Sequence, residues 1–228
     1  MQEVRHRFHQ ELTDLEHELL GEGDLAARAV ELATEAMVHR DASQCRQVVA
    51  DDDEVDRRYL DIEHRVLELL ALQTPVAKDL RLVSAILHVN LHLERIGDQA
   101  VNVAKITLAT MDLPRDEAIV AHLQEMGEIS ARMVRAALDA FARRDLELCL
   151  QLPAMDDPVD LLNRGMYRQV VALADDPALL EWGIRMNVVA RQIERVGDNA
   201  VDIAEQVGFL LTGEFREFTD ASHGGGVT

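Results

Sequence analysis

The chain contains the segment ERIGDQAVNVAK at residues 94–105 and a close copy, ERVGDNAVDIAE, at residues 194–205. Seven of the twelve residues are identical, and most of the exchanges (Ile/Val, Gln/Asn, Asn/Asp and Val/Ile) keep the size of the side chain. Self-similarity at a long, fixed offset indicates a duplicated structural unit. Because the ionisable residues are among those held in common, we expect the two copies to share a role as well as a fold.

The duplication extends over nearly the whole chain. Upstream of the two segments the offset becomes 104 residues, so that Cys45 corresponds to Cys149 and the acidic run 52–56 to residues 156–160. The cysteines are expected to be small core residues, one in each half. We expect the chain to be divided into a first half, a second half and a disordered tail, at residues 1–112, 113–213 and 214–228.

Composition and periodicity favour an all-α protein. Aromatic residues make up only 4% of the chain, which leaves little to build strands. Apolar residues recur at steps of four and three through residues 55–69 and 82–103, as they do on one stripe of a helix. Thr74-Pro75 and Asp176-Pro177 predict the starts of the third and sixth helices. The prediction is six helices in two tandem antiparallel three-helix bundles, set end to end as an elongated rod.

The charge balance restricts the possible partners. Lys and Arg total 23 against 42 Asp and Glu, a net charge of −19, so a nucleic-acid-binding surface is not expected and cations or basic protein surfaces are. The sequence offers neither a window of about 20 apolar residues for membrane insertion nor a secretory signal, which predicts a cytoplasmic protein. It also lacks a glycine-rich phosphate loop and a nucleophile elbow.

Four pairs of carboxylates recur at a spacing of four residues, which places both members of a pair on one face of a helix. Like charges at this spacing destabilise a helix by about 0.2 to 0.5 kcal/mol per pair, so four pairs argue for a positive partner. Gly97 and Gly197 indicate close helix approach, since glycine inside a helix costs about 1 kcal/mol. With the polar residues one turn further on, the candidate metal ligands are Asp52, Asp56, Glu94, Asp98, Asn102, Asp156, Asp160, Glu194, Asp198 and Asp202.

A solvated acidic face explains the same pattern equally well, with Asp98 bridged to Arg95 and Asp198 to Arg195. If a metal binds, an all-oxygen ligand set suits Mg, Ca, Mn or Fe better than a thiolate-type zinc site does. A metal-storage or redox protein is the alternative function. A ferritin-like di-iron site needs two Glu-x-x-His motifs, and the sequence has one, at residues 3–6.

At its acidic motifs the chain resembles the PhoU family of phosphate-uptake and phosphate-signalling regulators. The run PVAKDLRLVSAILHVNLHLERIGDQAVNVA, residues 75–104, closely follows the pattern of that family. The resemblance implies two PhoU-type three-helix bundles that carry iron or zinc on carboxylate clusters. It also implies a cytoplasmic homodimer that acts as a non-enzymatic negative regulator and links the ATPase of the phosphate ABC transporter to a sensor histidine kinase.

Overall fold

The structure is a computed structural model that describes residues 2–73 and 75–218. Within these ranges the chain forms six α-helices, which confirms the all-α prediction. Long helices of 26 to 38 residues fill most of the chain. In chain order they are α1 (Gln2–His39), α2 (Ala42–Leu72), α3 (Lys78–Ala109), α4 (Glu117–Arg143), α5 (Leu146–Val171) and α6 (Pro177–Thr212).

Aspartate side chains begin four of these helices by accepting hydrogen bonds from backbone N–H groups of the first turn. Asp176 accepts such bonds at the start of α6, where Pro177 is the first helical residue, as the sequence predicts. The corresponding prediction for the third helix is wrong. It begins at Lys78, after Ala77 at φ 47° with no side-chain cap, and not at Pro75; Thr74 lies outside the described residues.

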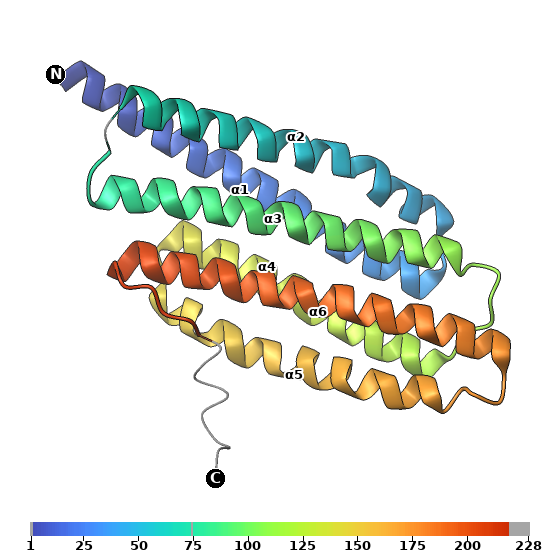
Figure 1. Cartoon of the computed structure of the whole chain (residues 1–228). Helices are drawn as coiled ribbons and strands as arrows, with labels where there is room; N and C mark the ends of the chain where they lie inside the picture. Colours follow the sequence, from blue (N-terminus) through green and yellow to red (C-terminus); the bar gives the residue numbers. More distant parts are fainter. Residues whose placement is uncertain (1, 74, 219–228) are drawn as a thin grey trace, which may run out of the picture.

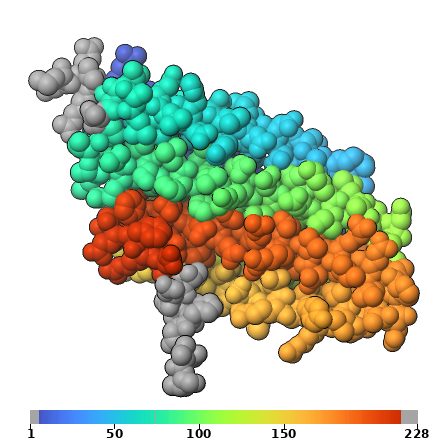
Figure 2. Space-filling view, viewed as in Figure 1, coloured from blue at the N-terminus to red at the C-terminus, as the bar shows by residue number. Residues whose placement is uncertain are grey.

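Helices α1, α2 and α3 form one antiparallel bundle, and α4, α5 and α6 form the other. The bundles join along their length through α1 against α4 and α3 against α6. Figure 1 shows α2, α3, α6 and α5 side by side in a front layer with α1 and α4 behind it, and Figure 2 shows the front four as parallel bands. The end-to-end arrangement predicted from the sequence is therefore wrong, because the bundles lie side by side.

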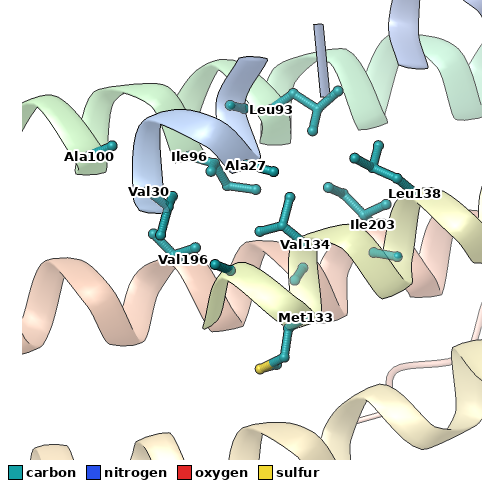
Figure 3. Packing of buried hydrophobic residues seen from close by; sticks show 14 of the residues in the cluster. Ala27, Val30, Leu93, Ile96, Ala100, Met133, Val134, Leu138, Val196 and Ile203 are labelled. Carbon is teal, nitrogen blue, oxygen red and sulfur yellow. The ribbon is translucent and has the colours of Figure 1, made fainter. Parts of the chain in front are cut away.

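The physical reason is the amount of apolar surface on the inner helices. A continuous core runs through both bundles: Ala27 and Val30 of α1 and Ile96 of α3 point toward Val134 of α4 and Val196 of α6 (Figure 3). Bundles stacked end to end would leave these apolar faces in water. The two cysteines, Cys45 and Cys149, belong to this core, as predicted, and so does the single tryptophan, Trp182.

Reciprocal contacts show that the two copies are related by an approximate two-fold axis. His92 Nδ1 on α3 lies 3.5 Å from Asp202 Oδ2 on α6. At the equivalent place in the other direction, Asn102 on α3 donates to Gln192 Oε1 on α6 at 3.4 Å. Helices α3 and α6 therefore run antiparallel, as α1 and α4 do.

After α6 the chain turns back against the second bundle. Phe218 is buried beside Gly208, and its amide donates to Glu205 Oε1 at 2.6 Å. Most of the tail predicted at residues 214–228, namely residues 219–228, lies outside the described residues.

Candidate carboxylate cation sites

Eight of the ten predicted site residues gather in two clusters, one in each bundle. The first cluster lies between α2 and α3, where Asp98 raises the pKa of Asp52 and Asp56 raises that of Glu94. The second cluster lies between α5 and α6, where Asp198 contributes to the raised pKa of Asp156 and Asp160 to that of Glu194. The first cluster is Asp52, Asp56, Glu94 and Asp98; the second cluster is Asp156, Asp160, Glu194 and Asp198.

The first cluster is half open to solvent. Burial, and then the nearby charges of Asp56 and Asp98, raise the pKa of Asp52 to about 6. Burial and Asp98 likewise raise the pKa of Glu94. Asp56 and Asp98 are exposed. The carboxylates therefore repel one another without any compensating ion pair within 4.0 Å in the part of the chain that the structure describes.

The second cluster is more deeply buried. Burial raises the pKa of Asp156 to about 7, with Asp198 the next largest cause. Glu194 is only 6% exposed, and burial raises its pKa to about 7 as well. Asp156 Oδ1 and Glu194 Oε2 are buried and accept no hydrogen bond from any described residue. These two acceptor atoms are thus removed from water, and no hydrogen-bond donor among the described residues takes the place of the water.

The glycines at the clusters allow the helices to approach closely, as the sequence indicates. A Cβ atom added to Gly97 would lie 3.3 Å from Val55 Cγ1 and 3.4 Å from Asp52 Oδ1. A Cβ added to Gly197 would overlap Asp156 Oδ1 outright. The carboxylates on α2 and α5 therefore rest directly on the glycine surfaces of α3 and α6.

The space around the added Cβ differs between Gly97 and Gly197, so the same substitution at both positions tests the close approach. We expect Gly97→Ala to change the free energy of unfolding by less than about 1 kcal/mol, because the gain in helix propensity offsets a slight crowding. Gly197→Ala should lower it by about 1 kcal/mol, because Asp156 must move. Urea unfolding of both variants at one pH measures the difference, and equal effects would contradict the close approach at Gly197.

The other two predicted ligands, Asn102 and Asp202, lie outside both clusters, at the contact of α3 with α6. Asn102 contacts Gln192 there, and Asp202 lies beside His92. The Nδ1 atom of His92 is also 2.8 Å from Asn199 Oδ1. These side chains join the two bundles to each other.

Sequence reasoning missed Glu22 of α1. This glutamate is fully buried, and neither of its carboxylate oxygens has a hydrogen-bond partner among the described residues. Burial raises its pKa to about 8, partly offset by Arg58 and reinforced by Glu94 of the first cluster. Met126 occupies the equivalent position of the second copy, so the repeat gave no reason to single out Glu22. One feature of the sequence does indicate that Glu22 is buried: it lies on the apolar stripe of α1 between Leu19 and Ala26.

The clusters place carboxylates near one another without closing them around a centre. Among the residues that the structure describes, no three His, Cys, Asp or Glu side chains converge closely enough to hold a metal ion. Mutual repulsion between like charges favours such an open arrangement. In the described residues there is also no helix long and apolar enough to cross a bilayer.

Fold and clusters together define a duplicated helical protein with one set of carboxylates between the second and third helices of each copy. The family model for the PhoU domain matches residues 19–107 and 123–207. The chain therefore belongs to the PhoU family, a regulatory and non-enzymatic family.

Relatives and solved structures agree over most of the chain. A phosphate-specific transport system accessory protein PhoU homolog from Pseudomonas aeruginosa is 32% identical over 96% of this chain and 89% of the relative. The crystal structure of PhoU from Pseudomonas aeruginosa superposes with a TM-score of 0.85, at 34% identity over 91% of this chain and 100% of that chain. The crystal structure of the phosphate transport system regulatory protein PhoU from Streptococcus pneumoniae gives 0.83, at 27% identity over 92% and 99%.

Proposed function

We propose that this chain is a negative regulator of phosphate uptake and phosphate-responsive signalling, and that it works as a cation-binding adaptor between the ATPase of a phosphate ABC transporter and a sensor histidine kinase. The names of its relatives, accessory and regulatory proteins of phosphate transport, support the general role. The observation that carries the cation-binding part is the pair of buried, unpartnered carboxylate oxygens in the second cluster.

The carboxylate oxygens of both clusters are donors of the type that a divalent cation prefers, but the side chains would have to move closer together to hold one, because no three of them converge among the described residues. A buried acceptor without a donor costs about 1 to 3 kcal/mol, and a cation held by Asp156 and Glu194 would lower that cost. All-oxygen donors suit Mg, Mn, Ca or Fe; iron or zinc, implied by the family, stays a prediction. When bound, a cation would supply positive charge between α2 and α3, or between α5 and α6. It would be held by the four carboxylates of the first cluster and the four of the second.

The outer helices offer surface for an adaptor. Leu60 and Leu67 are more than half exposed on α2, and Leu161 and Tyr167 on α5 are 69% exposed. These apolar side chains lie on the helices that carry the acidic pairs. A partner with apolar and basic groups suits such a surface. The homodimer and the cytoplasmic location stay predictions.

Retention of the partners tests the adaptor role. The immobilised chain is incubated with the transporter ATPase or with the cytoplasmic part of the kinase, in Mn²⁺ and then in chelator. We expect at least one partner to be retained, and Leu67→Ser together with Tyr167→Ser to weaken retention. If neither partner is retained in either condition, the adaptor role is wrong.

Neutralising one carboxylate tests the cation-binding role. We expect Asp98→Asn or Asp198→Asn to weaken Mn²⁺ binding at its own cluster by about tenfold, because one charge of four is lost, while the metal-free protein melts at an unchanged or higher temperature. Elemental analysis and a thermal melt measure the two effects. Asp53→Asn and Asp157→Asn, at exposed neighbouring positions, are the matched controls. A collapsed melt with the metal retained would be the opposite result.

A further inference from the structure

The segment that follows α6, residues 213–218, packs back onto the second bundle and is called the C-terminal strap below. Gly213 has a φ of 77°, a left-handed conformation that glycine tolerates, and it reverses the direction of the chain after α6. Figure 1 shows the strap, in dark red, running from the end of α6 toward α5. Its first five residues are exposed and only Phe218 is buried. The strap is therefore anchored to the bundle at Phe218.

Phe218 lies in a groove between the start of α5 and the end of α6. At the floor of the groove is Gly208, where an added Cβ would lie 3.1 Å from Phe218 Cζ, so a larger residue would press against the ring. The amide of Phe218 donates to Glu205 Oε1 at 2.6 Å. Leu146 and Leu150 of α5 line the opposite side. The groove thus offers a hollow for an aromatic ring and an acceptor for the backbone N–H of the same residue.

The strap occupies the groove without filling it. A cavity of about 220 Å³ remains beside Phe218, and Leu150 at its rim is 58% exposed. Further contacts of the strap are local: Arg216 pairs with Glu214, which bonds in turn to the hydroxyl group of Thr212. Such local contacts can persist when the strap leaves the bundle, so they do not oppose its release. Uncovered apolar surface beside an aromatic anchor is typical of a surface that binds another chain.

The equivalent residues of the first bundle do not provide such a groove. With an offset of 100 residues, Leu108 corresponds to Gly208 and Lys105 to Glu205. Leu108 packs against the hydrophobic core, so α3 carries its own side chain at the place where α6 has a hollow. A lysine side chain has no acceptor for a backbone N–H. The groove is therefore a property of the second copy and not a requirement of the three-helix bundle.

We propose that this groove binds an extended segment of another protein through an aromatic side chain, and that the C-terminal strap is an internal competitor that closes it. The inference goes beyond the proposed function and depends neither on the carboxylate clusters nor on the adaptor role. The way in which Phe218 is bound defines the partner segment: an aromatic residue with a free backbone N–H. Because the strap is tethered through Gly213, its effective concentration at the groove is on the order of millimolar. A partner must overcome that competition.

A peptide with the sequence of the strap, TGEFREF (residues 212–218), is the probe. It is labelled with a fluorophore at its N-terminus, amidated at its C-terminus and titrated against the full chain up to about 1 mM, the concentration with which the tethered strap competes. We expect the Phe218→Ala chain, whose strap has lost its anchor, to bind the peptide. The wild-type chain should bind it at least about tenfold more weakly, because its groove is occupied. Fluorescence anisotropy measures both affinities.

The second aromatic residue of the strap supplies a matched control. Phe215 is 57% exposed, so the Phe215→Ala chain should bind the peptide as weakly as the wild type does. In the peptide, alanine at position 218 should abolish binding to the Phe218→Ala chain, whereas alanine at position 215 should leave that binding unchanged.

Variants of the groove are made in the Phe218→Ala chain. Gly208→Leu installs the residue of the first copy and should abolish peptide binding, because leucine fills the hollow. Glu205→Ala should weaken binding roughly three- to tenfold through the loss of one hydrogen bond, and Glu205→Gln, which keeps an acceptor oxygen, should restore most of it. The glutamate variants keep the test decisive if Gly208→Leu disturbs folding, which a thermal melt detects.

Two outcomes overturn the inference. Equal binding of the peptide by the wild-type and Phe218→Ala chains would show that the strap does not close the groove. No binding by the Phe218→Ala chain, or binding that survives alanine at position 218 of the peptide, would show that the groove does not take an aromatic segment. Neither outcome affects Mn²⁺ binding or retention of the transporter ATPase and the kinase, so the proposed function is tested separately.

Discussion

At pH 8, Glu22→Gln should raise the free energy of unfolding of the metal-free protein by about 4 kcal/mol. Glu22 is fully buried without a hydrogen-bond partner among the described residues, and burial raises its pKa from 4.5 to about 8. In the unfolded chain the group ionises near pH 4.5. Folding at pH 8 must therefore either bury a charge or bind a proton, and glutamine removes that cost.

The sign of the pH dependence follows from the same values. The folded state binds more protons than the unfolded state between pH 4.5 and about 8. As far as Glu22 determines it, the free energy of unfolding is therefore highest below pH 4.5 and falls as the pH rises to about 8. The raised pKa values of Asp52, Asp156 and Glu194 act in the same direction. Urea unfolding of wild type and variant at pH 5, 6, 7 and 8 measures the difference.

Two further variants make this experiment specific. Glu22→Met installs the residue found at the equivalent position, Met126, and should flatten the pH dependence as glutamine does. Glu125→Gln, exposed on α4, removes a carboxylate with no expected change. A gain from Glu22→Gln that is the same at pH 5 and pH 8 would show that Glu22 does not titrate as its burial requires.

Gly23→Ala and Gly127→Ala should each lower the free energy of unfolding by about 1 to 3 kcal/mol. These glycines occupy equivalent positions on α1 and α4, where the two bundles meet. A Cβ on Gly23 would overlap the side chain of Leu138, and a Cβ on Gly127 that of Thr34. The overlap outweighs the gain of about 1 kcal/mol in helix propensity.

Gly165→Ala is the matched control for these two variants. Gly165 lies inside α5, and an added Cβ would meet nothing within 4 Å. This variant should therefore be more stable than the wild type by up to about 1 kcal/mol. Thermal or urea unfolding measures all three, and Leu138→Ala should partly rescue Gly23→Ala. Stabilisation by all three alanines would refute the tight contact of α1 with α4.

The repeat made much of the fold predictable. Two copies of one helical unit, with caps such as Asp176, led directly to six helices. The spacing of Asp52 and Asp56 on one helix, and of Glu94 and Asp98 on the next, predicts that each pair shares a helix face, and the structure brings the two pairs together. Helix periodicity fixes which residues share a face, and short connections make neighbouring helices antiparallel.

What the sequence did not predict depends on contacts between the copies. Periodicity assigns Ile96 to an apolar face but does not say whether that face meets its own bundle or the other one, and so the bundles were expected end to end. Glu22 has no equivalent carboxylate in the second copy, so the repeat does not mark it as a site residue. Whether Arg164 and Arg191 reach the second cluster was a question of side-chain direction, which the alignment of the copies alone does not answer.

The approximate two-fold axis resembles the symmetry of a dimer. A symmetric dimer of identical three-helix chains has antiparallel contacts of the same kind, and here residues 110–116, between α3 and α4, join the two copies into one chain. In a dimer of identical chains every substitution appears on both sides of the axis. Once the copies are fused, one side can acquire an arginine while the other keeps its leucine, as at positions 191 and 91.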